Sequence, residues 1–269
     1  MGKAVSSTGP GNGSRPRFEL KYVAPLETAQ RFADQLSPWF YADPHTSNGC
    51  YRVSSLYFDT PALGAYFEKL NGIDPRTKHR IRYYGNGEAA QTTPPSHLFV
   101  EAKHRIDQTV QKTRVLVPME SLPPVLTSGF PVLRLRQHAM EKDISAAESL
   151  DTAFLRKTLC PWVTVNYLRR PYIFEHDSSV RITFDTMISA MTPANFLKQD
   201  WEHGQKVLPR HLCIVEIKYF HGLPHCIGEL VRSSGMTLRR YSKFASALEA
   251  IYPKQTSRAI RIAPTIGSN

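Results

Sequence analysis

The sequence predicts an α+β protein built on a large antiparallel sheet, closed into a β-barrel with a polar, basic lumen and covered by helices. Seven short segments alternate charged and apolar residues, as in Lys78-His79-Arg80-Ile81-Arg82. Because residues two apart in a strand share a face, each segment has one charged face and one largely apolar face. Strand-like segments also outnumber helical ones, and turn-rich stretches separate several of them.

In the first half of the chain, the pattern predicts five strands and two helices. The first helix, residues 26–40, has apolar residues at helical spacing in Phe32, Leu36 and Phe40. The second, residues 62–70, follows a Thr-Pro start signal and precedes an Asn-Gly stop signal. The strands are expected at 18–23, 51–58, 79–84, 98–104 and 108–117.

In the second half, helices are expected at 145–159, 226–235 and 241–252. The strands are expected at 163–168, 180–184 and 212–220. Residues 191–210 show no periodicity and are predicted to form a long loop.

The chain has 269 residues, enough for one large domain, which we expect at 17–252. Residues 1–16 and 253–269 are predicted to be flexible tails. The four cysteines lack the spacing of a zinc or redox motif, so we expect reduced thiols in a cytoplasmic protein. No apolar run approaches the roughly 20 residues that span a bilayer, and no membrane span is expected.

The charge balance is strongly basic, with a formal net charge of +11 and a pI near 9.6. These values favour a negatively charged partner. The alternating segments contain eleven cations and four acids. They are Lys21, Lys78, Arg80, Arg82, Lys103, Arg105, Lys112, Arg114, Arg169, Arg181 and Lys218, with Glu19, Glu101, Asp185 and Glu216.

A solvent-exposed sheet face would produce the same alternation. However, Lys78, Arg80 and Arg82 crowd like charges on one face, which destabilises a sheet unless an anion neutralises them. The same polarity recurs in strands from the whole chain, and the arginine fork suits phosphate oxygens. We therefore expect the charged faces to line a lumen. Helices would then cover the apolar faces, with Phe18, Leu20, Ile81, Tyr83, Ile182, Phe184, Val215 and Ile217.

Nucleic acid is the main competing polyanion, and its sites usually add aromatic residues beside the cations for base stacking. Most strand aromatics here have the opposite parity to the cations, although Phe99 and Tyr167 share the cation face. A narrow bore suits phosphate chains better than a long duplex. No nucleic-acid partner is therefore expected.

The few acids in this basic setting have two interpretations. Each Glu-x-Lys pair is explained by an ion pair alone. Three carboxylates in one lumen, Glu19, Glu101 and Glu216, would also hold a hard divalent cation, Mg²⁺ or Mn²⁺, that bridges phosphate oxygens. The sequence has no Walker A loop and no GxGxxG loop, which argues against a P-loop mechanism.

The order of motifs resembles the VTC-type polyphosphate polymerase domain, a branch of the triphosphate tunnel metalloenzymes related to the CYTH group. The resemblance spans roughly residues 17–252. The motifs are Glu19-x-Lys21, Tyr57-Phe58-Asp59, Lys78-x-Arg80-x-Arg82, Glu101-x-Lys103, Lys112-x-Arg114, Tyr167-x-Arg169, Arg181-x-Thr183-x-Asp185, Glu216-x-Lys218 and Ser242-Lys243-Phe244.

The resemblance implies a tunnel enzyme that binds a divalent metal and makes inorganic polyphosphate from ATP. From it and the charge pattern we expect catalytic roles for Lys21, Arg80, Arg82 and Lys243, and a metal-binding role for Glu216 with Glu19 and Glu101. Phosphate binding is expected from Lys78, Lys103, Lys112, Arg114, Arg169, Arg181 and Lys218. The alternatives are a tripolyphosphate or nucleoside triphosphate hydrolase of the same fold, and a polyphosphate-binding module without catalysis.

Overall fold

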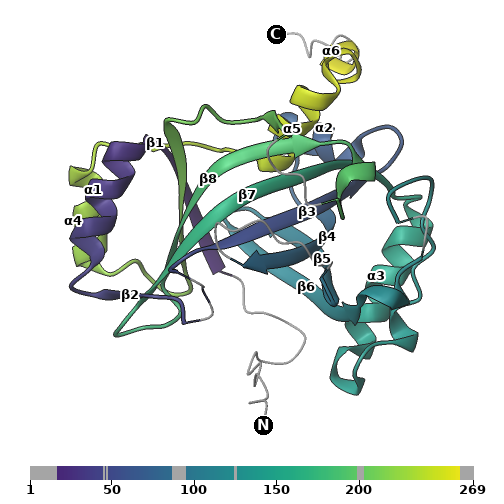
Figure 1. The fold of residues 1–269 in the computed structure, drawn as a ribbon, viewed down its shortest axis with the longest axis horizontal. Helices are drawn as coiled ribbons and strands as arrows, with labels where there is room; N and C mark the ends of the chain where they lie inside the picture. Colours follow the sequence, from purple (N-terminus) through teal and green to yellow (C-terminus); the bar gives the residue numbers. More distant parts are fainter. Residues whose placement is uncertain are drawn as a thin grey trace, which may run out of the picture.

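Alternating sequences of this kind form a closed ring of strands in the computed structural model (Figure 1), which confirms the predicted fold class. The structure describes residues 17–260 except 45, 47, 87–94, 124–125 and 199–202. Eight antiparallel strands follow the ring order β7-β3-β4-β5-β6-β1-β10-β8, and β8 pairs back to β7. They are β1 (Arg17–Pro25), β3 (Tyr51–Asp59), β4 (Arg76–Asn86), β5 (His97–Ile106), β6 (Thr109–Pro118), β7 (Cys160–Phe174), β8 (Arg181–Met191) and β10 (Leu212–Tyr219).

The ring closes over very different lengths at its two seams. Strands β7 and β8 pair over most of their length, whereas β1 meets β6 only at Arg17 and Phe18. Further along, β1 pairs instead with the short strand β11 (Thr237–Leu238). Two other short strands extend the sheet, β2 (Phe40–Ala42) beside β7 and β9 (Gln205–Lys206) beside β8.

The helices are α1 (Leu26–Leu36), α2 (Gly64–Leu70), α3 (Ile144–Arg156), α4 (His225–Ser233), α5 (Lys243–Ile251) and α6 (Pro253–Ile260). Helices α1, α3 and α4 cover the outside of the ring, as predicted for an inverted barrel, whereas α5 packs into one end of it. Single 3-10 turns occur at Met119–Ser121, Leu135–Gln137, Glu141–Asp143 and Pro193–Asn195. No helix in the described part of the chain is both long and apolar enough to span a bilayer.

Two apolar cores lie between these helices and the outer faces of the strands. Helix α3 packs on β3–β6, where Ile81 and Tyr83 are buried against its apolar face. On the other side of the barrel, α1 and α4 pack on β1, β8 and β10 over Ile182, Val215 and Ile217 (Figure 1). The predicted outward direction of these apolar residues is therefore confirmed.

Three boundaries differ from the sequence predictions. Helix α1 ends at Leu36, before Pro38, because proline has no amide hydrogen to continue the helix and its ring clashes with the preceding turn, and Phe40 begins β2 instead. The predicted loop at 191–210 contains the turn at Pro193–Asn195 and strand β9. Helix α6 occupies the start of the predicted C-terminal tail, where Thr256 is buried and its hydroxyl donates to the Tyr252 carbonyl. The predicted N-terminal tail, 1–16, and residues 261–269 of the predicted C-terminal tail, 253–269, lie outside the described residues.

Adjacent residues of α3 test the outer core. Phe154 is 2% exposed and its ring centroid lies 4.9 Å from that of Phe58, whereas Leu155 is 67% exposed. We expect Phe154→Ala to lower the free energy of unfolding by about 3–5 kcal/mol through the cavity it leaves. The control Leu155→Ala should change it by less than about 0.5 kcal/mol. Urea denaturation measures both, and equal effects would contradict the assignment of α3 as a core element.

Candidate active site in the barrel lumen

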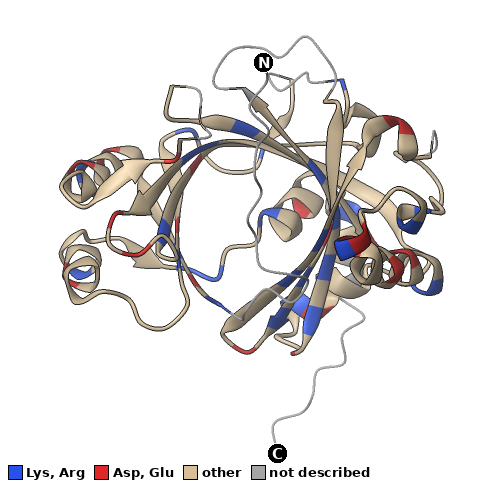
Figure 2. Ribbon diagram, turned by 90° about the horizontal axis from the view of Figure 1, so that it is seen from below, with Lys and Arg blue, Asp and Glu red and all other residues tan. Residues whose placement is uncertain are grey.

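The strand register places the predicted charged residues on one face of the barrel wall, the lumen. Paired residues on neighbouring strands share a face, and Lys21 pairs with Glu216, Arg80 with Glu101, and Arg169 with Asp185. Lys and Arg residues are distributed along the strands of the ring (Figure 2). The lumen is therefore lined by cations interspersed with a few carboxylates.

Glu216 on β10 lies at the centre of the largest ion-pair group. Its carboxylate contacts Lys21 (3.4 Å), Lys243 (2.9 Å), Lys218 (3.1 Å) and Arg169 (3.4 Å). Burial raises the pKa of Glu216, but these four cations outweigh burial and hold the pKa well below its usual value. Glu216 is therefore ionised at neutral pH.

A second buried carboxylate, Asp185 on β8, joins the same group. It accepts two hydrogen bonds from Arg169, of 2.6 and 2.7 Å, and contacts Lys243 at 2.6 Å. Burial lowers the pKa of Lys243, but Asp185 and Glu216 outweigh it and raise the pKa above its usual value. Lys243 is the first residue of α5, whose N-terminus Ser242 caps by accepting a hydrogen bond from the Ala245 amide. The cap thus fixes the position of Lys243 in the lumen.

Two other carboxylates extend the ion pairs around the lumen. Glu101 on β5 is fully buried and contacts Arg80 (2.7 Å), Lys112 and Arg114 (3.4 Å). Glu19 on β1 binds Lys103 at 2.6 Å and Lys21 at 3.1 Å, and so links β1 to β5. The predicted cations therefore form two clusters, one around Glu216 and Asp185 and one around Glu101, and Glu19 lies between them.

Arg82 and Lys78, both on β4, have hydroxyl partners instead of carboxylates in the described part of the chain. The Arg82 guanidinium is 4% exposed and donates to Ser55 Oγ (2.8 Å) and Tyr167 Oη (3.1 Å). Lys78 Nζ donates to Ser242 Oγ at 2.8 Å. Burial, together with the neighbouring Lys103 and Lys21, holds the pKa of Lys78 well below its usual value. These two side chains retain the capacity to bind an anion.

Two predicted cations lie apart from these clusters. Arg181 pairs with Asp43, and its side chain is 35% exposed. Arg105 donates to the backbone carbonyl of Asp107 in the β5–β6 turn. Arg181 therefore lies toward the edge of the lumen, and Arg105 belongs to the turn.

The three carboxylates predicted to bind a metal do not come together. Glu19 and Glu216 lie on adjacent strands, where the Lys21 ammonium contacts both, whereas Glu101 lies among Arg80, Lys112 and Arg114. Among the described residues, no three His, Cys, Asp or Glu side chains form a group suited to a metal. The prediction of one site with all three carboxylates is therefore wrong. The oxygens of Glu19 and Glu216 still fit a cation such as Mg²⁺, which takes one or two carboxylates and completes its shell with phosphate oxygens.

Aromatic residues also line the lumen; sequence reasoning placed Phe99 and Tyr167 on the cation face but missed Tyr51, Tyr57 and Tyr84. Tyr57 accepts a hydrogen bond from Arg80 (3.2 Å) and its ring stacks on Phe244 at 5.1 Å. The Tyr167 ring lies 4.9 Å from Lys243 Nζ. Tyr57 and Tyr167 share their strand faces with Ser55 and Arg169, so the alternation contained the signal. Three further lumen aromatics are Tyr51, Tyr84 and Phe99.

One end of the lumen is apolar. Phe244, Ala247 and Leu248 of α5 are buried against Val163, Val165, Ile188, Ala190 and Ile214, which occupy inward positions on β7, β8 and β10. The basic region is therefore confined to the rest of the lumen, beyond the N-terminus of α5.

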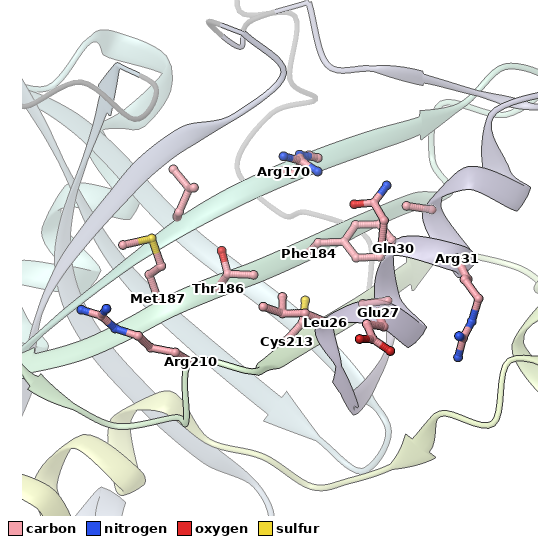
Figure 3. A pocket seen from close by; sticks show the side chains of 13 residues that line it. Leu26, Glu27, Gln30, Arg31, Arg170, Phe184, Thr186, Met187, Arg210 and Cys213 are labelled. Carbon is pink, nitrogen blue, oxygen red and sulfur yellow. The ribbon is translucent and has the colours of Figure 1, made fainter.

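A separate groove of about 730 Å³ lies outside the barrel, between α1 and the outer faces of β7 and β8 (Figure 3). Phe184 and Met187 contribute apolar surface, and Arg31, Arg170 and Arg210 are among its polar lining residues. None of the predicted site residues lines this groove. The predicted chemistry belongs to the lumen.

Comparison with known proteins agrees with the motif order. A family model described as the VTC domain matches residues 16–252. The fold is also similar to a proposed adenylate cyclase from Bacillus halodurans (TM-score 0.48, 12% identity, 86% of this chain and 95% of that chain). A proposed adenylyl cyclase from Hippeastrum, described as having a dominant triphosphatase activity, gives a TM-score of 0.47 and 14% identity over 86% of this chain and 94% of that chain. A Pyrococcus horikoshii protein gives a TM-score of 0.43 and 15% identity over 87% of this chain and 98% of that chain.

Glu101 offers a test of charge balance in the lumen. Glu101→Gln keeps the side-chain shape but leaves Arg80, Lys112 and Arg114 without their anion, so we expect the free energy of unfolding to fall by about 3 kcal/mol. Saturating tripolyphosphate should raise the melting temperature more in this variant than in the wild type. Glu148→Gln, at an exposed ion pair with Arg136, is the control and should change stability by less than about 1 kcal/mol. Equal stability of all three proteins would contradict the assigned role of Glu101.

The lumen lysines predict a pH dependence of anion binding. Burial lowers the pKa of Lys112 to about 8, although Glu101 opposes the shift. A bound phosphate favours the charged ammonium and raises this pKa, so binding takes up a proton, and affinity is lost as pH rises above 8. We expect calorimetry in EDTA to show tripolyphosphate affinity falling from pH 7 to 9.5. The fall should be smaller in Lys112→Arg, whose charge does not titrate in this range. Identical pH profiles would refute the prediction.

Proposed function

Since the chain belongs to the VTC domain family, we propose that it is a polyphosphate polymerase, which transfers the γ-phosphate of ATP to a growing inorganic polyphosphate chain. ATP carries a linear triphosphate and polyphosphate is a linear chain of phosphate groups, and both must lie within reach of the same cations. The proposal therefore concerns the lumen.

The observation that carries this proposal is the unbalanced positive charge on β4. The buried Arg82 and its neighbour Lys78 contact hydroxyl groups and no carboxylate among the described residues. A buried cation without an anionic partner is costly, and a bound phosphate removes this cost. Side chains on one strand face recur about every 7 Å, so β4 presents Lys78, Arg80 and Arg82 as a row that follows an extended phosphate chain.

The reaction requires positioning and charge stabilisation by these side chains. An oxygen of the terminal phosphate of the chain forms a bond to the γ-phosphorus, the bond between this phosphorus and the β,γ-bridging oxygen breaks, and ADP leaves with the electron pair. Arg80 and Arg82 hold the transferred group, and Lys21 and Lys243 neutralise the charge that develops. The attacking oxygen is already ionised, so no strong general base is required. Lys103, Lys112, Arg114, Arg169, Arg181 and Lys218 would bind the remaining phosphates.

A divalent metal fits the same arrangement. Glu216 and Glu19 would hold Mg²⁺ or Mn²⁺, with phosphate oxygens as the other ligands. Such an ion supplies additional charge neutralisation on the phosphate oxygens. Lys21 contacts both carboxylates, so Glu19 and Glu216 lie on either side of one cation position in the lumen.

The test is incubation of the purified protein with ATP and Mn²⁺, with and without a short polyphosphate primer, and separation of the products on a gel. Long phosphate chains support the polymerase. Orthophosphate and ADP without chains indicate a hydrolase, and ATP that binds but is not consumed indicates a non-catalytic module.

We expect Arg82→Ala to lower kcat/KM about 100-fold or more, because it removes a buried donor to the transferred group. The exposed control Arg136→Ala should retain wild-type activity, and an equally active Arg82→Ala would reject the site.

A further inference from the structure

We propose that Tyr51, Tyr84 and Phe99 form a binding platform for the base of the nucleotide, at the end of the lumen opposite α5. The proposal rests on the proposed function in one respect, that the phosphate donor is a nucleoside triphosphate. It assigns a subsite for the part of this substrate that the cations do not contact.

The three rings form a continuous aromatic group from three adjacent strands. Tyr51 on β3 meets Tyr84 on β4 edge-on with centroids 5.4 Å apart, and Tyr84 meets Phe99 on β5 in the same way at 5.6 Å. The guanidinium of Arg114 lies over the Phe99 ring, 3.4 Å from its centroid. Aromatic rings and stacked arginines are the surfaces on which proteins bind bases of any sequence.

The register places this group next to the phosphate-binding row. Tyr84 follows Arg82 by two residues on β4, one step of about 7 Å along the same face, and Phe99 on β5 pairs directly with Arg82. Tyr51 pairs with Arg169 across β3 and β7. A nucleotide with its phosphates on Arg80 and Arg82 would therefore reach the rings with its base.

Side chains at the aromatic end of the lumen are partly exposed to solvent, so a base has access to the rings. Tyr84 is 36% exposed, and Leu116, which faces the lumen beside Phe99, is 38% exposed. Tyr84 and Phe99 belong to none of the three apolar clusters of the described residues. At the other end, α5 fills the barrel with Phe244 and Leu248. The orientation with the base at the aromatic end is thus the one that the packing permits.

These rings have a competing role, to hold the arginines beside them. The Arg82 guanidinium lies 5.9 Å from the Tyr84 centroid, within the range of a cation–π contact. If that were the whole role, loss of a ring would weaken every phosphate ligand equally. A ligand with the same phosphates but no base separates the two roles.

The experiment compares dissociation constants of ATP and tripolyphosphate, measured by calorimetry at one Mg²⁺ concentration. For Tyr84→Leu and Phe99→Leu we expect ATP affinity to fall between about 5- and 100-fold, from the loss of base stacking. Tripolyphosphate affinity should change less than twofold. Tyr84→Phe should recover most of the ATP affinity, because it restores the ring, and Leu116→Ala at the same end should leave both ligands unaffected.

Two results would overturn the platform. One is unchanged ATP affinity in both leucine variants, and the other is an equal loss for ATP and tripolyphosphate. Neither depends on turnover, so a wild-type protein that fails to make polyphosphate would reject the proposed function and leave the binding result to be judged separately.

Discussion

Ion pairing between buried carboxylates and the lumen cations is the constraint on which the structure depends. Removing charges from water costs several kcal/mol for each ion unless partners compensate it. Glu19, Glu101, Asp185 and Glu216 each contact at least two cations, and their side chains are at most 7% exposed. These acids are too few to neutralise every cation individually. The barrel can therefore fold around its own charges and still retain sites for a polyanion.

A charged lumen also determines what lies outside the barrel. The strands alternate, so polar residues inside require apolar residues outside, and these must be covered. Helices α1, α3 and α4 supply that cover, and the main cores lie between helices and strands instead of within the ring. Helix α5 is different because it packs inside one end and brings Lys243 to Asp185 and Glu216. A helix near the end of the described chain thus brings its lysine to the lumen carboxylates.

The alternation with period two is a local property, and for this reason the strands, their faces and the inward direction of Arg80 or Glu216 could be predicted. Which carboxylate meets which cation depends on ring order and stagger, which no local pattern encodes. Only β6 lies between β1 and β5, and Glu19 of β1 contacts Lys103 of β5 across it. Glu101 on β5 and Glu216 on β10 are separated by both β6 and β1. The failure of the three-carboxylate metal site follows from this. Helix α6 was missed because its polar sequence resembles a tail, and only the burial of Thr256 shows that it packs.

The two ends of the lumen differ in a way that would orient the proposed reaction. In-line transfer requires the attacking phosphate to approach the γ-phosphorus from the side opposite the leaving ADP. With the base at Tyr84, ADP would lie toward the aromatic end, and Arg80 and Arg82 would hold the transferred group. The acceptor phosphate would then lie on the side of Lys78, which β4 places beyond Arg80 and which contacts Ser242 at the N-terminus of α5. Lys78 pairs with Lys103 of β5 at this level, so β4, which would hold the donor, also presents a cation for the acceptor beside one from β5.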